Sequence, residues 1–579
     1  MTVAEQLVDI LEKAGVKRIY GVTGDALNGV VDSIRKRDNL EWIAMRHEEN
    51  AAFAAYAEAA LTGSPAVCAG TVGPGALHLI NGLYNAKREG VPVLAITGQV
   101  ATHELGTGFF QEVNLIKAFE DICKYQAVIR SPEQAPRIIL KALQETIQNN
   151  CVCRIEIPVD IANGKASGKD FIHPVFKQSP SIKADTELVA DAAKMINDAK
   201  KVSILAGEGC RNAKEEVLAL AKKIKAPIVH SLKALDIFDH DTPNVVGLTG
   251  LIGNATGYHA IMKADVIIMM GTNFPYTNFL PDKKKFIQVD LKSENIGNRV
   301  AVDIGIIGDA KAVSMELGRL VDEKSNDSFL NTLQEKFQSW RKDKEKEGSL
   351  DRDGTPMHPQ IVTERVNHLA SNDAVFIIDV GEVTVWAARH LVLNGNRRLL
   401  GSFSHGTMGV APPSAIGAQL VNKNREVWAL VGDGAFVMNM QDFVTAARYR
   451  LPIKIIVYNN EELSFVKMEM EEAGLPIHEE SLNLKNPDFA KYAEICGGKG
   501  ITVTTPDQMD SAIMEAKNYD GPCIIDARVT AGELLLPPKI TLDEAWGFSK
   551  SKVKELFLAV KGEKEQWKNI KEEMKAFID

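Results

Sequence analysis

The sequence predicts an α/β protein built from doubly wound parallel sheets. Short β-branched runs such as VPVLAITG, DVIIMMG and IKIIVYNN alternate with segments of helical periodicity, a pattern typical of parallel sheets covered by helices on both faces. A chain of 579 residues also exceeds what one hydrophobic core usually supports. Two polar stretches rich in Gly, Pro and Lys, 163–186 and 341–359, indicate linkers. Together these observations predict three α/β units.

The composition favours a soluble globular protein, with 45% hydrophobic and 25% charged residues. A net charge of -9 offers no basic surface for nucleic acid, so no nucleic-acid partner is expected. Seven cysteines without metal-ligand spacing indicate reduced thiols and a cytoplasmic protein. The first residues predict an amphipathic helix rather than a signal peptide, and no apolar run reaches the roughly 18 residues of a spanning helix. Any membrane role would therefore be peripheral.

Two segments resemble copies of one unit. PAVCAGTVGPGALHLINGL and VWALVGDGAFVMNMQDFVTA both predict a strand, a glycine turn and a helix, and each is followed by a strand that starts at proline. Gly73 to Pro92 is 19 positions and Gly432 to Pro452 is 20. We interpret this match as an internal duplication, which invites a ligand site between the two domains, at their strand ends.

The second copy carries polar residues where two successive strands end. In the stretch 431–460, Asp433 follows one strand and Asn460 the next, and the carboxyl ends of adjacent parallel strands lie at the same edge of a sheet. A carboxylate and an amide oxygen suit Mg²⁺, which also takes phosphate oxygens. GDG alone is a common turn and NN a common strand exit. Their combination at this spacing predicts a magnesium diphosphate site.

GDG, then 24 residues (435–458) and then NN resembles the signature of enzymes that use thiamine diphosphate. The resemblance implies three doubly wound domains of that superfamily: a pyrimidine-binding domain at 1–165, an FAD-binding middle domain at 185–335 and a diphosphate-binding and Mg-binding domain at 355–530, followed by a tail at 531–579. It implies that Asp433, Asn460 and the carbonyl of Glu462 bind the metal. The implied diphosphate contacts are Gly432, Asp433, Gly434 and Ala435.

The same resemblance assigns a role to RHEENAAFAAYAEA at 46–59. Glu48 is implied to be the glutamate that activates the aminopyrimidine of the cofactor, with Glu49 as the neighbour with which it could be confused. The plain alternative is an acid favoured by the helix dipole. Gly73 in TVGPG would face the cofactor. Gly406, Thr407 and Met408 in HGTMG would lie under the thiazolium, with ordinary core packing as the alternative for Met408.

The middle segment resembles a nucleotide-binding unit, but GEGCRN lacks the third glycine of the Rossmann fingerprint, which argues against NAD. GLTGLIG, GTNFPYTNF and FIQVDL resemble the FAD-binding domain of the pyruvate oxidases, whereas in related decarboxylases this domain can be empty. The implied FAD contacts are Thr249, Gly250, Leu251, Ile252, Thr272, Asn273, Phe274, Pro275, Tyr276 and Asp290.

Over essentially the whole chain, the resemblance is closest to the pyruvate dehydrogenases that contain FAD and reduce quinone. It implies oxidative decarboxylation of pyruvate to acetate and carbon dioxide via hydroxyethyl-thiamine diphosphate, with electrons passing to FAD and then to quinone, in a homotetramer. Phe465 would lie between the two cofactors, although such an aromatic is more often packing. The residues implied to surround the substrate are Phe110, Gln111, Val380, Phe465, Val466 and Glu469.

Three alternatives stay open. A phosphate-dependent pyruvate oxidase would make acetyl phosphate and hydrogen peroxide with oxygen as acceptor, and an acetohydroxyacid synthase-like carboligase would keep FAD only as a structural group. A non-catalytic membrane-binding protein is a distant third. The tail has one apolar helical face. It predicts either a docked helix or peripheral contact with the inner face of the membrane, and it departs from the quinone-reducing relatives in its Lys and Glu content.

Overall fold

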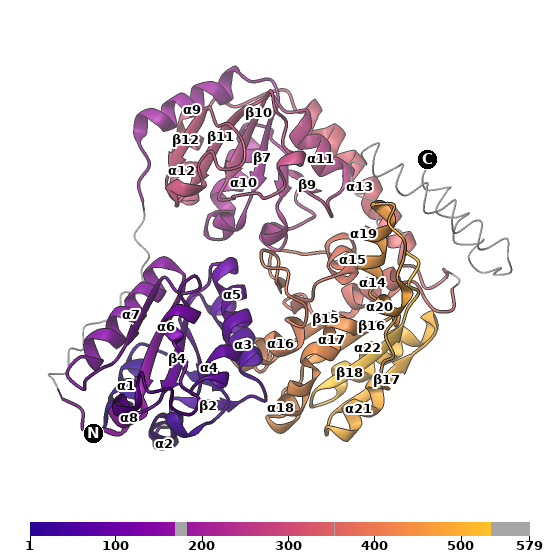
Figure 1. The fold of residues 1–579 in the computed structure, drawn as a ribbon. Helices are drawn as coiled ribbons and strands as arrows, with labels where there is room; N and C mark the ends of the chain where they lie inside the picture. Colours follow the sequence, from indigo (N-terminus) through magenta and orange to yellow (C-terminus); the bar gives the residue numbers. More distant parts are fainter. Residues whose placement is uncertain (168–181, 353, 534–579) are drawn as a thin grey trace.

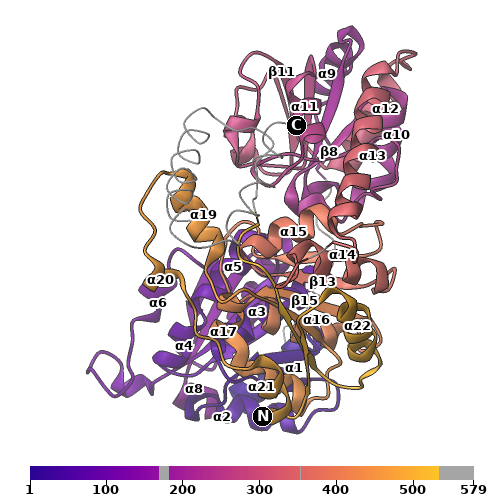
Figure 2. The ribbon, with the colours of Figure 1, turned by 90° about the vertical axis from the view of Figure 1, so that its right-hand side faces the viewer.

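The computed structural model describes residues 1–167, 182–352 and 354–533, which form three six-stranded parallel sheets (Figures 1 and 2). The predicted fold class, three α/β domains with parallel sheets, is confirmed. The central part of the first linker (168–181) and the tail from residue 534 lie outside the described residues. Within those residues, no helix is both long enough and apolar enough to cross a bilayer.

The N-terminal domain has the strand order β2-β1-β3-β4-β6-β5. Its strands are β1 (Arg18–Gly21), β2 (Glu41–Ala44), β3 (Ala66–Gly70), β4 (Val93–Gln99), β5 (Tyr125–Val128) and β6 (Val152–Pro158). Its helices are α1 (Val3–Lys13), α2 (Asn28–Arg35), α3 (Glu48–Thr62), α4 (Pro74–His78), α5 (Ile80–Glu89), α6 (Leu115–Ala118), α7 (Ala135–Asn149) and α8 (Val159–Asn163). The central strands β3, β4 and β6 are buried throughout, as expected for strands covered on both faces.

The middle domain has the order β12-β11-β10-β7-β8-β9. The chain therefore runs outward from β7 in one direction and from β10 in the other, so the sheet has a topological switch point between these two strands. Its strands are β7 (Val202–Ala206), β8 (Ile228–His230), β9 (Val245–Leu248), β10 (Val266–Met270), β11 (Lys285–Asp290) and β12 (Ile304–Ile307). Its helices are α9 (Thr186–Asp198), α10 (Lys214–Lys223), α11 (Ala255–Met262), α12 (Ala310–Leu320) and α13 (Ser328–Glu347).

The C-terminal domain repeats the strand order of the N-terminal one, as β14-β13-β15-β16-β18-β17. Its strands are β13 (Val375–Ile378), β14 (Arg398–Gly401), β15 (Val427–Gly432), β16 (Lys454–Asn459), β17 (Lys499–Val503) and β18 (Cys523–Arg528). Its helices are α14 (Pro359–Leu369), α15 (Glu382–His390), α16 (Ala411–Val421), α17 (Asp433–Asn439), α18 (Phe443–Arg448), α19 (Ser464–Glu472), α20 (Glu479–Leu482), α21 (Phe489–Ile495) and α22 (Met509–Asn518). This shared order is what the proposed duplication requires.

The predicted linker at 341–359 is wrong in its first part, because α13 continues to Glu347. Phe337 is buried in the middle domain and stacks on Trp340, with ring centroids 5.7 Å apart. The exposed face of this helix carries Lys and Glu side chains, and ion pairs at i, i+3, such as Lys346 with Asp343, join them. Such pairs support a solvated helix. The polar composition that suggested a linker belongs to that face.

The N-terminal and C-terminal domains share one apolar core, and α3 packs on α16 between them (Figure 1). These two helices occupy equivalent places, since α3 lies between β2 and β3 and α16 between β14 and β15. A Cβ atom on Gly417 would lie only 2.1 Å from the backbone oxygen of Ala54. The Ser414 hydroxyl donates to the Phe53 carbonyl oxygen at 3.2 Å. The backbones of the two domains therefore meet directly.

A buried carboxylate joins the middle domain to the C-terminal domain. Asp236 accepts from Arg211 at 2.8 Å, from the Arg398 side chain at 2.9 Å and from the Leu399 amide at 3.0 Å. Burial alone would raise the pKa of Asp236, but the two guanidinium groups hold it below its usual value. The N-terminal domain joins the same region, because Lys233 lies 3.2 Å from the buried carboxylate of Glu89. We call Asp236, Arg211, Arg398, Lys233 and Glu89 the ionic junction.

We expect Asp236→Asn to destabilise the protein strongly, by about 3–5 kcal/mol, because it removes the buried carboxylate that Arg211 and Arg398 share. Arg211 keeps a second carboxylate, that of Glu208 at 3.8 Å. Thermal or denaturant unfolding measures this loss. The matched control is Glu316→Gln, which removes an exposed partner of Arg319 and should cost no more than about 1 kcal/mol. If the two substitutions lowered the free energy of unfolding equally, the ionic junction would contribute no more to stability than an exposed ion pair does.

Candidate functional site

The ends of β15 and β16 bring Asp433 and the asparagine turn together. These strands pair in parallel, with Gly432 opposite Tyr458, and the Asp433 carboxylate accepts from the Glu461 amide at 2.7 Å and from the Asn486 side chain at 2.7 Å. Glu461 adopts a left-handed conformation, with φ 57°, and such strained residues cluster at functional sites. The turn after β16 is thus held against Asp433.

A pocket of about 160 Å³ opens at this edge of the sheet. Ten residues of the predicted site line it: Val380, Met408, Gly432, Asp433, Gly434, Ala435, Asn460, Glu462, Phe465 and Val466. Glu469, one turn after Phe465 on α19, is exposed and does not line this pocket, nor do Gly406 and Thr407. Residues from four strand ends and from the helices α14, α15, α17 and α19 therefore meet at one place.

The pocket concentrates carboxylates without a matching cation among its own side chains. Burial raises the pKa of Asp433 to about 6. Burial also raises the pKa of Glu382 to about 8, and the neighbouring carboxylates of Glu462 and Asp433 add to this effect. Carboxylate, amide and carbonyl oxygens suit a hard divalent cation, so the Asp433 carboxylate, the Asn460 amide oxygen and the main-chain carbonyl of Glu462 would form a donor set that fits Mg²⁺.

The loop that carries Met408 is held from both sides. Asp379, fully buried at the end of β13, accepts from the Gly409 and Ala411 amides, each at 2.8 Å. On the other side Asn81 of α5 donates to the Thr407 hydroxyl at 2.9 Å, and its side-chain oxygen lies 3.0 Å from His405 Nε2. The N-terminal domain of the same chain thus fixes Gly406 and Thr407 in place.

Glu48 lies in a separate cluster at the start of α3. Its side chain is buried, and one carboxylate oxygen lies 2.9 Å from Nδ1 of His78. His78 stacks on His47 with ring centroids 4.5 Å apart. His47 Nδ1 accepts from the Glu49 amide at 3.2 Å, so Glu49 is held in a different way from Glu48. This geometry fits a carboxylate kept in one position for proton transfer.

The predicted Gly73 and Gln111 belong to the same edge of the N-terminal domain. A Cβ on Gly73 would lie 2.5 Å from the Gln111 carbonyl oxygen, and Gln111 itself has φ 65°. A Cβ on Gly75 would lie 3.0 Å from a Glu48 carboxylate oxygen. Phe110, beside Gln111, is 78% exposed. The glycine turn, Glu48 and Gln111 therefore form one surface with an exposed aromatic at its margin.

One chain does not bring this surface into the pocket that holds Asp433. Among the described residues, every group that lines the pocket comes from the C-terminal domain, between Pro359 and Val529. The sequence analysis expected the two domains to share a site. The structure of a single chain instead presents two partial sites.

The predicted FAD loops meet at the switch point of the middle sheet. Gly271, after β10, approaches Gly209, after β7, so closely that a Cβ on it would lie 2.7 Å from the Gly209 Cα atom. A Cβ on Gly250 would lie 3.1 Å from the Tyr276 ring and 3.3 Å from the Phe274 ring. The turn at Thr249–Ile252 and the turn at Thr272–Tyr276 are therefore neighbours.

Several atoms at these loops are suited to a bound ligand. The Thr249 hydroxyl oxygen is buried and has no hydrogen-bond partner within the part of the chain that the structure describes. Leu251 and Tyr276 are 45% and 42% exposed. Asp290, at the end of β11, accepts from the Lys292 amide at 2.9 Å. The remaining members of the predicted set are the exposed Pro275 and Asn273, which accepts from Arg299 at 3.1 Å.

Comparisons with known proteins agree with this architecture. Three family profiles match: the thiamine pyrophosphate enzyme N-terminal TPP binding domain at 1–118, the central domain at 189–317 and the C-terminal TPP binding domain at 379–527. A relative from Bacillus subtilis (strain 168), whose name describes it as a thiamine pyrophosphate-containing protein, is 39% identical over 558 residues, covering 96% of each chain. The chain belongs to the thiamine pyrophosphate enzyme family.

Two further relatives of this thiamine pyrophosphate enzyme carry names of different activities. Pyruvate oxidase of Lactiplantibacillus plantarum is 30% identical over 548 residues, which cover 93% of this chain and 90% of the relative. The acetolactate synthase large subunit of Pyropia yezoensis is 31% identical over 563 residues, covering 93% of each chain. Both activities occur among decarboxylating enzymes of the thiamine pyrophosphate family. The two sequence identities are too similar to decide between these activities.

Sequence reasoning missed three side chains of this thiamine pyrophosphate enzyme. Asp379 directly follows the apolar run AVFII, and an acid directly after an apolar strand is the same signal that identified Asp433. Glu382 follows in the same run and lines the pocket. Asn486, which bonds Asp433, lies in a loop with no recognisable motif, so its role could come only from the structure.

Proposed function

We propose that the protein is a pyruvate oxidoreductase that uses thiamine diphosphate, Mg²⁺ and FAD. It decarboxylates pyruvate oxidatively to acetate and carbon dioxide and passes the electrons to FAD and then to quinone. The observation that carries this proposal is the position of α19, which presents Phe465 and Val466 to the pocket of Asp433. The clustered flavin loops and the similarity to a pyruvate oxidase support it.

The chain's own residues have definite roles in this proposal. Asp433, Asn460 and Glu462 would hold Mg²⁺, and Met408 would lie against the thiamine rings. The thiazolium supplies the positive charge that takes up the electron pair left by carbon dioxide, and the flavin supplies a two-electron acceptor. Val466 lines the pocket and would contact the substrate, and Glu469, which lies outside this pocket in a single chain, would join the site from one turn further along α19.

A second copy of the chain would complete the site. The Glu48 surface and the Asp433 pocket are separate within one chain, so a Glu48 surface from a partner chain is the simplest way to bring the acid to the cofactor. The homotetramer expected for such an enzyme provides two chains for each site. Phe110 and Gln111 would enter the site with that partner surface, and Val380 would meet them from its own strand end.

The first test is the flavin absorbance of the purified protein, kept free of oxygen with Mg²⁺ and thiamine diphosphate, before and after pyruvate is added. We expect the yellow flavin to bleach, because the decarboxylated substrate delivers two electrons to it. Re-oxidation by a soluble quinone analogue, without hydrogen peroxide or acetyl phosphate, would separate the quinone-reducing activity from the phosphate-dependent oxidase.

The rival function is a carboligase, which the similarity to acetolactate synthases favours. In that case FAD is structural, pyruvate disappears while the flavin stays oxidised, and acetolactate accumulates. The same sample, assayed for acetate and acetolactate, decides between the two reactions.

A quinone acceptor also requires access to a membrane from the cytoplasm. The segment proposed for this contact, 531–579, lies outside the described residues from residue 534 onward.

A further inference from the structure

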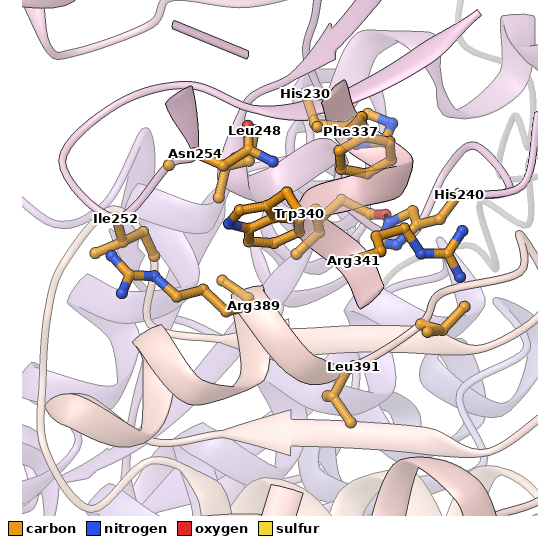
Figure 3. A pocket seen from close by; sticks show the side chains of 15 residues that line it. His230, His240, Leu248, Ile252, Asn254, Phe337, Trp340, Arg341, Arg389 and Leu391 are labelled. Atoms are coloured by element: carbon orange, nitrogen blue, oxygen red, sulfur yellow. Dashed lines mark hydrogen bonds between the residues drawn. The ribbon is translucent and has the colours of Figure 1, made fainter. Parts of the chain in front are cut away.

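Two features of the molecule lie outside the sites described above. One is a small cavity between the middle and C-terminal domains, with α13 and the end of α15 in its lining (Figure 3). Its volume of about 30 Å³ has room for two or three waters at roughly 10–15 Å³ each. Such waters would satisfy the buried ring nitrogens of His230, which have no partner within the described residues. The other feature is a contact between the thiols of Cys151 and Cys153 in the N-terminal domain.

Cys151 and Cys153 lie on one face of the chain where β6 begins. Cys153 is the second residue of this strand and Cys151 directly precedes it, and side chains two positions apart in a strand point to the same side. Both pack in the apolar cluster that includes α1 and α7, whereas Val152 between them belongs to the cluster on the other side. The two sulfur atoms are 3.8 Å apart. Two oxidisable sulfur atoms are therefore in contact.

The pair can be reached from the side of Cys151. Cys151 is half-buried, whereas Cys153 is fully buried. Cys151 follows Asn150, which ends α7 in a left-handed conformation with φ 44°, and its thiol donates to the Glu145 carbonyl oxygen at 3.3 Å. A reagent for this pair must therefore be small and enter past Cys151.

The contact between the two thiols also affects their reactivity, because the thiolate is the nucleophilic form of cysteine. Hydrogen bonding with Cys151 holds the pKa of Cys153 below its usual value, although burial opposes this shift. The same contact raises the pKa of Cys151. By contrast, burial raises the pKa of Cys123, Cys210 and Cys523 to about 12. The pair thus combines a thiolate with a neighbouring thiol, as in cysteines that are oxidised and then resolved to a disulfide.

A disulfide between these two residues would be strained. Two positions along a strand separate the Cα atoms by about 6.4–6.8 Å, at the upper end of the roughly 4.4–6.8 Å that a disulfide spans. The sulfur atoms would also have to approach from 3.8 Å to about 2.05 Å. Strained or exposed disulfides are the easily reduced ones. Such a bond would therefore form and be lost reversibly, and it would not serve as a permanent staple of the fold.

We propose that Cys151 and Cys153 form a reversible disulfide when they react with a hydroperoxide such as hydrogen peroxide. The Cys153 thiolate attacks one peroxide oxygen, so that an S–O bond forms, the O–O bond breaks and the second oxygen leaves as hydroxide, which takes up a proton to become water. The Cys151 thiol then attacks the Cys153 sulfur, so that the S–S bond forms, the S–O bond breaks and a second water leaves. The two thiols together lose two electrons, and the peroxide is reduced to two waters. This chemistry does not depend on the reaction that the enzyme catalyses.

The experiment treats the full-length holoenzyme with hydrogen peroxide, alkylates the remaining thiols with iodoacetamide in denaturant and follows the tryptic peptide 142–154 by mass spectrometry. This peptide, which Lys141 and Arg154 delimit, contains Cys151 and Cys153 and no other cysteine. We expect it to become lighter by two hydrogens and to lose both alkylation sites at least about tenfold faster than Cys123 loses its own, because a buried thiol of raised pKa is a poor nucleophile. Reduced glutathione should restore the doubly alkylated peptide.

Cys151→Ser removes the resolving thiol. The peptide should then form no disulfide and should carry one oxygen on Cys153, which dimedone captures. Cys496→Ser changes a half-buried cysteine of the C-terminal domain and, as the matched control, should leave disulfide formation unchanged. Cys151→Ala is the second variant if Cys151→Ser does not fold. A peptide 142–154 that stays doubly alkylated while Cys123 is oxidised would overturn the proposal, and so would an oxidised peptide that glutathione does not restore.

Discussion

Replacing Asp433 by alanine should abolish the binding of Mg²⁺ and thiamine diphosphate together. The carboxylate is the charged member of the donor set with Asn460 and Glu462, and it also holds the turn at Glu461 by accepting from its amide. Loss of even an outer partner of a metal ligand typically costs about 10–100-fold in affinity, so loss of the ligand itself should cost at least about 100-fold. Isothermal titration with each cofactor, alone and combined, measures this.

Two variants separate this effect from misfolding. Asp433→Asn keeps the size of the side chain and an oxygen for the Glu461 amide, and should lose metal affinity while the melting temperature stays close to that of the parent. Asp507→Ala changes an exposed acid in the same domain and should leave both cofactors bound. Normal cofactor affinity in Asp433→Ala would remove Asp433 from the metal site.

Glu48→Gln should leave cofactor binding largely intact and slow turnover by about 10²–10⁴-fold, the usual contribution of one general acid–base group. Glutamine keeps the shape and hydrogen bonding of the side chain, including its contact with His78, but it can neither accept nor return a proton. Exchange of the acidic thiazolium proton for deuterium, followed in the holoenzyme by quenched-flow NMR, measures the affected step directly.

The adjacent acid provides a control for this prediction. Glu49 accepts from Asn81 at 2.5 Å, a bond that Glu49→Gln can retain through its amide oxygen. That variant should exchange the proton at the parent rate. If the two glutamine variants slowed exchange equally, Glu48 would have no special role; if Glu48→Gln exchanged at the parent rate, it would not be the proton-transfer residue.

The fold could be predicted from the sequence because the strands of parallel sheets have a recognisable local sequence pattern. Strands buried on both faces, such as β10, read as unbroken apolar runs, and each is bounded by Gly or Pro. The GDG and NN turns were informative for the same reason, since strand ends at one sheet edge must meet. The composition of α13 instead predicted a linker where the structure has a helix. The reason is that the buried side of this helix, with Phe337, is narrow compared with its charged side.

The parts that could not be predicted depend on contacts between distant segments. Glu48 and Asp433 lie in domains that pack on each other, yet the sequence alone could not reveal that one chain keeps them in separate partial sites. Asn486 donates a hydrogen bond to the Asp433 carboxylate, although the two residues are 53 positions apart in the sequence. The cavity at His230 depends on α13 and α15, which reach it from different parts of the chain. Local sequence patterns contain no information on such long-range contacts.

The repeated strand order has an evolutionary consequence. If one ancestral unit was copied within the gene, each copy began with both a glycine turn after its third strand and a helix equivalent to α3. The first copy now has Glu48 and no acid in TVGPG, whereas the second has Asp433 in its turn and Ala411 at the start of α16. Each copy could then lose the acid that the other retained, either at the start of the helix or in the glycine turn. Neither copy alone would then carry both acids of the site. The close approach of Ala54 and Gly417 would preserve that mutual dependence, since any larger side chain at the second position collides with the first.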